Sequence, residues 1–555
     1  MATIDNVLKR LLPSGTGNRS TASWKSCPIW PPDLFAVVAT LVEQSGCYAD
    51  PPFTSPWHSS RFIFDTAGQS EIVSLGRSWI DAGAVPDDVQ ALWNTLINNK
   101  KRIITDRGPR TSSWKEAAVQ LLLIADEASV GLGFPVSEAP VPSLFGELVL
   151  ESHLELLKGQ TPTLPYVPRS LCLLVPPTEV CVQPKTNTPK VGCTLRSLTH
   201  NLALLPAEGV VTTTWRFAHP AAQTANELNL LLVPFPFRID DKAFAPEPGP
   251  SEQRHRFFKV DPGQWLATGA AGTPIGPDAF AAFLIDLVEA CDGPVHGVVL
   301  PELALPEEFA DQLAPILASR CPKLEFLISG VSHSDYSGPR NRAATYRFHD
   351  GRMLQSSKQS KHHRWSLNRS QIERYQLERR LDPGKIWWER IEMAERACDF
   401  DLLRQGASFA VLVCEDLARF DPVMPVINAV GPNLVIALLM DGPQLAVRWP
   451  GRYATVLADD PGSSVLTLTS LGMIRRSNGA DEDGQREIAL WKEVDGQPHP
   501  IVLPPDCHAV MLKLLGNPEQ QITLDGRDDQ YGAIVFRRLS EHGVVSRKPN
   551  AHIVI

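Results

Sequence analysis

The chain has 555 residues, of which 43% are hydrophobic and 21% charged, an ordinary globular composition that argues against wholesale disorder. With 53 Lys and Arg against 62 Asp and Glu, the net charge is −9, which argues against a general nucleic-acid binder held by phosphate contacts. The ten cysteines form no CxxC pair, so we expect reduced thiols in a cytoplasmic protein.

No apolar run in the sequence is long and uninterrupted enough to span a bilayer. The first ten residues mix charged and aliphatic side chains and contain no signal-peptide core. We therefore expect no membrane partner.

Residues 1–165 predict an all-α accessory domain of amphipathic helices joined by loops rich in Pro and Gly. Apolar residues at helical spacing predict helices over 34–44, 89–96, 114–125 and 143–158. Ser113 and Glu116 form a capping box before the third of them. No cluster of chemically reactive residues lies here, so a role in regulation, recruitment or capping stays open.

Residues 166–224 predict a small β-rich connector, with strands expected over 171–175, 179–182 and 210–217. From residue 225 to 555 apolar strands alternate with helices, which predicts an α/β layered fold. The expected strands cover 228–233, 295–300, 324–329, 409–413, 433–439 and 464–469, with a helix over 280–290 and a hairpin around 346–355.

Two of these strands end in a residue suited to catalysis. Glu302 follows the strand over 295–300, and Cys414 follows the strand over 409–413. Between them, a strand-like segment ends in two lysines, Lys358 and Lys361. Active-site groups of α/β proteins gather at the carboxyl ends of strands. A carboxylate, an ammonium group and a thiol at one sheet edge would form a nucleophilic site.

The segments around these residues resemble the motifs of the nitrilase superfamily of carbon–nitrogen hydrolases. Residues 299–303 (Val-Leu-Pro-Glu-Leu) resemble its first motif, and residues 411–417 (Val-Leu-Val-Cys-Glu-Asp-Leu) its third. Between them, Gly351 leads to Lys361-His362-His363, similar to the lysine motif. The resemblance covers about residues 225–510. It implies an α-β-β-α sandwich and hydrolysis of an amide or nitrile through a cysteine thioester, without a cofactor or metal.

By this resemblance Cys414 is the nucleophile, Glu302 the general base and Lys361 the residue that stabilises the oxyanion, with the backbone N–H of Glu415 as second donor. Lys358 is the alternative lysine, because the spacing from Gly351 does not decide between the two. The superfamily also uses a second glutamate between the lysine and the cysteine. Its candidates are Glu373, Glu378 and Glu389.

The chain departs from the superfamily pattern between Lys361 and Cys414, where the sequence is longer than usual. We expect a helical insertion at about 366–400, with helices over 366–377 and 385–397, as a lid or partner surface. Arg419 is one position away from an arginine of many relatives. These departures bear on the substrate more than on the type of reaction.

A narrower resemblance links residues 361–365, 414–419 and 458–462 to the large nitrilase-like modules associated with reverse transcriptases in bacterial antiphage systems. It implies an antiviral role and a partner protein of a defence system. The superfamily resemblance also implies a homo-oligomer, either a dimer or a spiral.

Other interpretations compete with the enzyme. Cys414 could be a buried small hydrophobic residue, as most free cysteines are, and the lysines a solvated basic edge. The fold would then serve as a catalytically silent scaffold or sensor that oligomerises and recruits a partner. His362 and His363 suggest a metal site, but neighbours on a strand point to opposite faces and do not easily share one ion.

Overall fold

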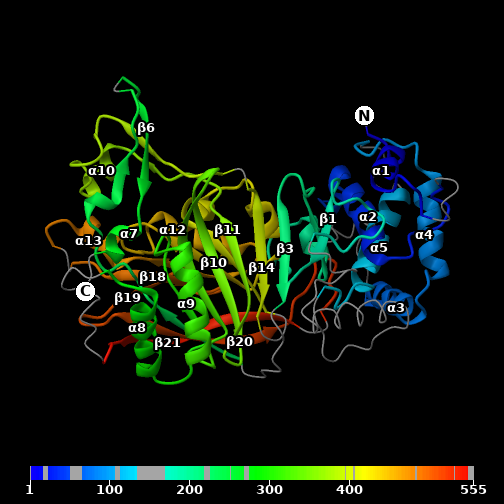
Figure 1. Ribbon diagram of the computed structural model, residues 1–555. Helices are drawn as coiled ribbons and strands as arrows, with labels where there is room; N and C mark the ends of the chain where they lie inside the picture. Colours follow the sequence, from blue (N-terminus) through cyan, green and yellow to red (C-terminus); the bar gives the residue numbers. More distant parts are fainter. Residues whose placement is uncertain are drawn as a thin grey trace.

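Two large β-sheets packed face to face form the centre of the computed structural model (Figure 1). The structure describes residues 2–16, 23–49, 66–106, 113–133, 169–217, 226–250, 252–267, 274–393, 395–403, 407–481, 484–529 and 532–547. Helices lie to one side of the sheets, toward the N-terminus, and against their outer faces (Figure 1).

The first sheet contains both ends of the predicted α/β region. Its strands are ordered β11 (Arg352–Ser360), β10 (Gly338–His349), β9 (Phe326–Asp335), β7 (Gly297–Val299), β4 (Glu227–Leu232), β20 (Ala509–Glu519) and β21 (Ala533–Val544), with β8 (Leu305–Pro306) beside β9. Because β7 runs parallel to β9, and β10 is antiparallel to both β9 and β11, the strands β7 and β11 point the same way. Their carboxyl ends therefore lie on the same edge.

The second sheet has a buried parallel centre. Its strands are ordered β19 (His499–Val502), β18 (Glu487–Lys492), β17 (Ser464–Thr469), β16 (Leu434–Leu439), β15 (Ser408–Val413), β14 (Ala397–Leu402) and β3 (Thr212–Phe217). Every residue of β15, β16 and β17 is buried, as expected for parallel strands covered on both faces. Their apolar runs are the ones that the sequence analysis assigned to strands.

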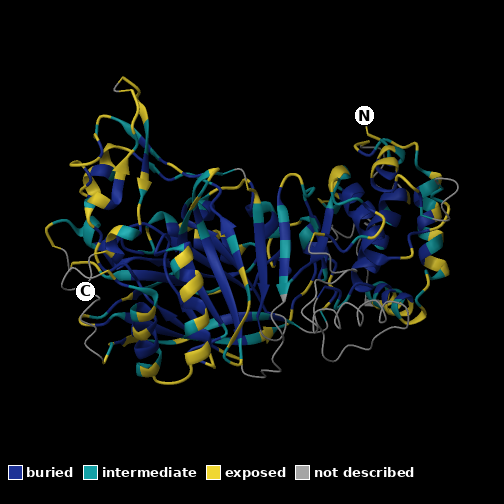
Figure 2. Ribbon diagram, viewed as in Figure 1, coloured by how far each residue is buried: buried dark blue, intermediate teal, exposed yellow. Residues whose placement is uncertain are grey.

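Helices cover the outer face of each sheet. On the first sheet, α8 (Pro277–Ala290) packs against α9 (Glu307–Arg320), which contacts β9, β10 and β11. On the second, α12 (Trp449–Asp459) contacts β17 and β18, and α13 (Leu471–Asn478) contacts β18. The exposed residues of α8 and α9 face away from the sheets (Figure 2). The predicted α/β class and its α-β-β-α layers are confirmed.

The facing surfaces of the two sheets are joined by aromatic and polar contacts. The rings of Phe326 on β9 and Phe409 on β15 lie 5.5 Å apart, and the Arg347 guanidinium lies 5.7 Å from each. Gln359 on β11 donates to the carbonyl of Val411 at 2.9 Å. These contacts hold the end of β11 opposite the end of β15.

A separate hydrophobic cluster is formed by the N-terminal helices α1 (Ile4–Leu11), α2 (Pro31–Ser45), α3 (Thr66–Ala82), α4 (Asp87–Asn98) and α5 (Ser113–Glu127). Three of them match helices expected from the sequence, whereas α1 and α3 were not expected. The expected helix over 143–158 lies outside the described residues. No helix in the described ranges has the length and apolar character needed to cross a bilayer.

The β-rich connector forms β1 (Cys181–Pro184), paired with β2 (Leu202–Leu205), and β3 in the second sheet. The strand expected over 171–175 is wrong. Leu173, Leu174 and Val175 all donate their backbone N–H groups to Asp33 Oδ1, at 2.8–3.0 Å. The backbone curls around this buried carboxylate and so cannot form a ladder.

The helical insertion expected at 366–400 is also largely wrong. The segment contains one short helix, α10 (Arg369–Arg374), and the strands β12 (Ser366–Leu367) and β13 (Ile386–Glu389). In place of a helix over 385–397, β13 pairs in parallel with β6 (His255–Val260). The four-stranded sheet so formed has the order β12-β13-β6-β5, with β5 at Phe244–Pro246.

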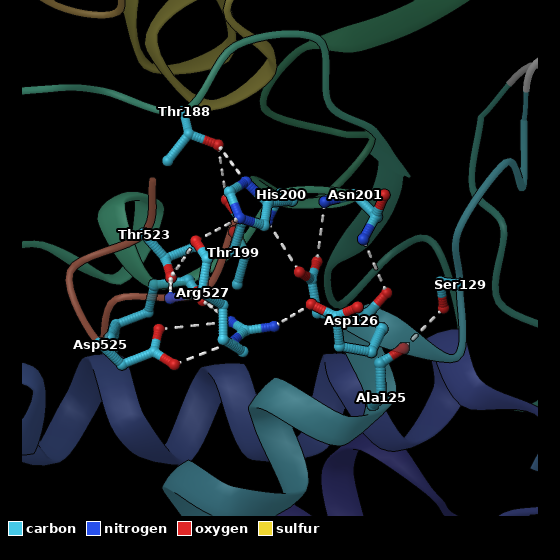
Figure 3. A network of polar contacts seen from close by, with 12 residues as sticks. Ala125, Asp126, Ser129, Thr188, Thr199, His200, Asn201, Thr523, Asp525 and Arg527 are labelled. Carbon is cyan, nitrogen blue, oxygen red and sulfur yellow. Dashed lines mark hydrogen bonds and ion pairs between the residues drawn. The ribbon is translucent and has the colours of Figure 1, made fainter. Parts of the chain in front are cut away.

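A buried ionic network joins the helical cluster to the C-terminal part of the chain (Figure 3). Arg527, fully buried, binds Glu127 at the end of α5 and donates to Asp525 at 2.7 Å. Asp126 accepts the backbone N–H groups of His200, Asn201 and Leu202 at 2.7–3.0 Å. Asp126 and Glu127, the last two residues of α5, are thus both used to bind later segments.

The Arg527→Met variant should unfold more easily, because it leaves the buried carboxylates of Glu127 and Asp525 without a counter-charge. Removing one partner of a buried ion pair costs about 3–5 kcal/mol of the free energy of unfolding. Urea unfolding of the full chain measures the loss. The control, Arg538→Met, breaks a part-exposed pair with Glu541 and should change stability by less than about 1 kcal/mol. Equal losses in the two variants would contradict the role of the network.

Candidate active site

Three strand ends bring the predicted catalytic residues together. Glu302 follows β7 on the same edge of the first sheet where Lys361 follows β11. Cys414 follows β15 in the facing sheet. The backbone turns sharply at two of these exits, because Leu303 and Cys414 have φ angles of 54° and 46°. Such left-handed conformations in residues other than glycine are strained and cluster at functional sites.

A closed set of hydrogen bonds surrounds Lys361. Its Nζ donates to Glu302 Oε1 and to Glu389 Oε2, each at 2.7 Å. The amide of Asn341 on β10 donates to the same Glu302 Oε1 at 2.7 Å and to Glu389 Oε1 at 2.8 Å. The side chains of Glu302 and Lys361 are 1% exposed and that of Glu389 3%. We call these four residues the Glu-Lys-Glu-Asn cluster.

The structure separates the candidates that the sequence left open. Lys358 lies outside the cluster, where its Nζ is 2.8 Å from Asp311 Oδ2 and 3.4 Å from Glu307 Oε1 on α9. Glu373 and Glu378 are exposed to solvent, on and just after α10. Glu389, at the end of β13, is the glutamate of the three that reaches Lys361.

The electrostatics of the cluster follow from burial and from close charges. Burial raises the pKa of Glu302, an effect that Lys361 opposes and Glu389 reinforces. Burial alone would lower the pKa of Lys361, but Glu302, Glu389 and Cys414 outweigh it and hold that pKa well above its ordinary value. Lys361 is therefore a permanent cation between two acids that compete for it.

The thiol of Cys414 belongs to the same electrostatic unit. Burial raises its pKa well above the ordinary value, Glu302 raises it further, and Lys361 and the backbone N–H of Met440 lower it. Cys414 is 2% exposed. A thiol in this setting is protonated at rest and requires a base nearby to become a nucleophile.

One oxygen of Glu302 is free to act as that base. Its Oε1 accepts from both Lys361 and Asn341, whereas its Oε2 is buried without a hydrogen-bond partner among the described residues. A buried acceptor left unpaired costs free energy unless a donor arrives. The thiol proton, or an N–H group of a substrate, is the donor that this position can take.

Asp416, two residues after Cys414, ties the lysine segment to the cysteine turn. Its carboxylate accepts the backbone N–H groups of His362 and His363 at 3.1 Å, and the His362 ring lies at the same distance. His362 is thereby committed to an acid and does not pair with His363. No group of three metal-binding side chains occurs in the described ranges.

Two residues of the site escaped the sequence analysis, Asn341 and Gly330. A Cβ at Gly330 on β9 would lie 2.4 Å from both the Glu302 Cα and the Pro301 carbonyl oxygen. Only glycine lets β9 approach the turn that presents Glu302. The available signals were weak, because Asn341 lies between two arginines of β10 and Gly330 lies between Ser329 and Val331 of β9.

The Gly330→Ala variant should shift the turn that carries Glu302, because backbone atoms block the added methyl group. Overpacking of this kind costs about 1–3 kcal/mol of the free energy of unfolding. Gly209→Ala is the matched control, since a Cβ there meets nothing within 4 Å. Thermal unfolding of both variants checks the prediction, and an unchanged midpoint for Gly330→Ala would contradict it.

No known family model matches the chain, and neither does any curated protein. Similar solved structures include the glutamine-dependent NAD+ synthetase of Acinetobacter baumannii, at 12% identity and a TM-score of 0.31, with 52% of this chain and 45% of that chain covered. A CN-hydrolase superfamily protein of Xanthomonas campestris has 14% identity and a TM-score of 0.26, with 57% and 91% covered.

A third similar structure is a nitrilase-superfamily member of Saccharomyces cerevisiae, at 13% identity and a TM-score of 0.27, with 56% of this chain and 90% of that chain covered. This chain spans less than half the length of the synthetase but nine-tenths of the other two.

Proposed function

We propose that this chain is a thiol hydrolase of C–N bonds, of the amide or nitrile class, acting through a thioester on Cys414. The observation that carries the proposal is the buried Oε2 of Glu302, which has no hydrogen-bond partner in the described part of the chain, in a cluster where Lys361 also lowers the pKa of the thiol. A base, a cation and a nucleophile in one water-poor site are the groups that acyl transfer requires.

The first step is proton transfer. Glu302 Oε2 takes the proton of the Cys414 thiol as the sulfur attacks the carbonyl carbon of an amide, forming the S–C bond. The π electrons of the C=O bond move to its oxygen, giving a tetrahedral oxyanion. The raised pKa of Glu302 suits it for this step, because a base works best when its pKa lies near the working pH.

The oxyanion is stabilised by donors that are already in place. An ammonium group has three N–H donors, and Lys361 uses two of them on Glu302 and Glu389. The third is left for the oxyanion. We assign the second donor to the backbone N–H of Glu415, the residue after the nucleophile.

Collapse of the intermediate completes the first half of the reaction. The oxyanion re-forms the C=O bond, the C–N bond breaks, and Glu302 returns the proton to the leaving nitrogen. This leaves a thioester and a free amine or ammonia. Water then attacks the thioester while Glu302 takes its proton, the C–S bond breaks, and the thiolate recovers that proton as the carboxylic acid product leaves.

One observation favours a second function. Cys414 is almost fully buried and its pKa is raised, as in a thiol that is inert. A catalytically silent scaffold or sensor that oligomerises and recruits a partner would have this property. Absence of any acyl-enzyme on Cys414 in well-folded protein would favour that function over hydrolysis.

We further propose, from the sequence resemblance alone, that the hydrolase is an effector in bacterial antiphage defence and works as an oligomer with a partner protein. Plaque counts on bacteria that carry the complete system, with either the wild-type chain or Cys414→Ser, test this role. Equal protection by the wild-type chain and by Cys414→Ser would show that hydrolysis has no part in the defence role.

The hydrolysis prediction concerns release of ammonia or amine from acetamide, N-propylacetamide and propionitrile. Cys414→Ser, Glu302→Gln and Lys361→Met should each lower kcat/KM by about a hundredfold or more, because each removes a group that acts in the transition state. Lys358→Met is the matched control and should change it by less than about twofold, since Lys358 pairs with Asp311 and Glu307 on α9, outside the cluster. Activity that survives both Cys414→Ser and Cys414→Ala in folded protein would contradict the mechanism.

The pH dependence has a defined sign. Because Glu302 must be ionised to accept a proton and its pKa is raised above 4.5, kcat/KM should rise with pH through that raised pKa. Glu389 contributes to the raise, so Glu389→Gln should move this acid limb to lower pH. The exposed Glu373→Gln is the control and should leave the limb in place. A limb that moves upward in Glu389→Gln would be inconsistent with Glu302 as the base.

A further inference from the structure

A cavity of about 510 Å³ lies beside the Glu-Lys-Glu-Asn cluster. One wall comes from the first sheet and α9, including Ser332 on β9 and Glu307 on α9. The opposite wall comes from the four-stranded sheet and the segments that follow it, including Ala245 and Lys259. Its volume is within the range of pockets that bind small molecules.

The cavity reaches the cluster on one side only. Leu303, Asn341 and Glu389 all line it. It therefore extends to the turn after Glu302, to Asn341, which donates to Glu302, and to Glu389, which accepts from Lys361. No residue of β15, β16 or the turn after Cys414 lines it. Asn341 and Glu389 line the cavity, whereas Glu302, Lys361 and Cys414 do not, so it adjoins the cluster from the side away from β15 and the cysteine turn.

The proposed chemistry assigns the two sides to different parts of a substrate. The acyl carbon becomes bonded to the Cys414 sulfur, whereas the leaving nitrogen receives its proton from Glu302. A substrate therefore has its acyl part toward the thiol and its amine part toward the base. The cavity beside the Glu-Lys-Glu-Asn cluster is therefore where the amine part of such a substrate would lie.

Buried acceptors lie just beneath the inner end of the cavity. Asn341 is 1% exposed, and its Oδ1 has no hydrogen-bond partner in the described part of the chain. Glu389 contributes a buried carboxylate next to it. An unpaired buried acceptor is stabilised by an arriving N–H donor, which an amide nitrogen or an amine supplies.

We propose that this cavity binds the amine portion of an N-substituted amide, so that the substrate is a secondary amide with a polar amine part and not a primary amide that releases only ammonia. This inference rests on the proposed function of the cluster. A site for ammonia alone would not need 510 Å³ on the base side.

The outer walls of the cavity carry charged side chains that a polar amine can bind. Lys259 and Arg390 line it and both pair with a single carboxylate, Glu247, at 3.0 and 3.5 Å. Two further lining acids, Asp261 and Glu308, are exposed. Charges of both signs offer hydrogen bonds to hydroxyl, amide or zwitterionic groups, beside apolar lining from Val260, Pro262 and Ile391.

The test uses alkylation of Cys414 in the full chain, which does not require turnover. Chloroacetamide and N-(2-hydroxyethyl)chloroacetamide both attach through their CH2 group, and the second carries a polar substituent on the amide nitrogen. Labelling of the Cys414 peptide is followed by mass spectrometry. In the wild-type chain the N-substituted reagent should label Cys414 at least as fast as chloroacetamide.

A large side chain that fills the cavity should make Cys414 react more slowly with the N-substituted reagent. Ser332→Phe should slow the N-substituted reagent by about tenfold or more, as expected when a pocket excludes a group, and slow chloroacetamide by less than about twofold. Ala245→Phe fills the cavity from the opposite wall and serves if Ser332→Phe does not fold. Ser356→Phe, on an exposed position of β11, is the matched control and should leave both rates unchanged.

A wild-type chain that reacts more slowly with the N-substituted reagent, or cavity variants that slow both reagents equally, would overturn the inference. The expected labelling pattern without hydrolysis of any amide would leave the cavity assignment standing and count against the proposed function. Hydrolysis restricted to primary amides would support the proposed function and count against the cavity assignment.

Discussion

The site depends on one buried ammonium group. Lys361 sits between two carboxylates at 2.7 Å from each, in a place where an unpaired charge would be very costly. Its contacts define where three distant segments must lie: the turn after β7, the end of β11 and the end of β13. Asn341 closes the set by binding both carboxylates. Because every member needs the others, the cluster is stable as a whole and intolerant of single losses.

The thiol is positioned by a different kind of constraint, the packing of the two large sheets. Cys414 is on the second sheet, whereas the side chains of the Glu-Lys-Glu-Asn cluster are on or beside the first. The thiol can therefore meet the cluster only if the two sheets keep one alignment against each other. Phe326, Arg347 and Phe409 stack between them, and Gln359 binds the β15 backbone. Asp416 adds a direct tie, since its carboxylate holds the backbone of the segment that follows Lys361. Apolar packing sets the approximate distance between the two sheets, and the buried hydrogen bonds set the final positions of the side chains.

Local sequence patterns predicted many of the strands of the two large sheets, and the predictions that were wrong or left open share one cause. The apolar strands that precede Glu302 and Cys414 are continuous in sequence, so strand, exit and polar residue could be placed together. The choice between Lys358 and Lys361 depends on which face of β11 meets the second sheet, and no local spacing contains that information. Glu389 is brought in by the pairing of β13 with the distant β6, and the 171–175 segment is shaped by Asp33, some 140 residues away. Where a remote partner supplies the hydrogen bonds, intrinsic propensity is overruled.

The same remote pairing links the catalytic cluster to the cavity. β5 and β6 come from a segment before α8, β12 and β13 come from the segment after Lys361, and only their pairing builds the outer wall. Glu389, the last residue of β13, both binds Lys361 and lines the cavity. A donor that binds Glu389 from the cavity would compete with Lys361 for its oxygens and reduce the charge that raises the pKa of Glu302. A substrate amine in the proposed site would therefore act on Glu302 through this one carboxylate.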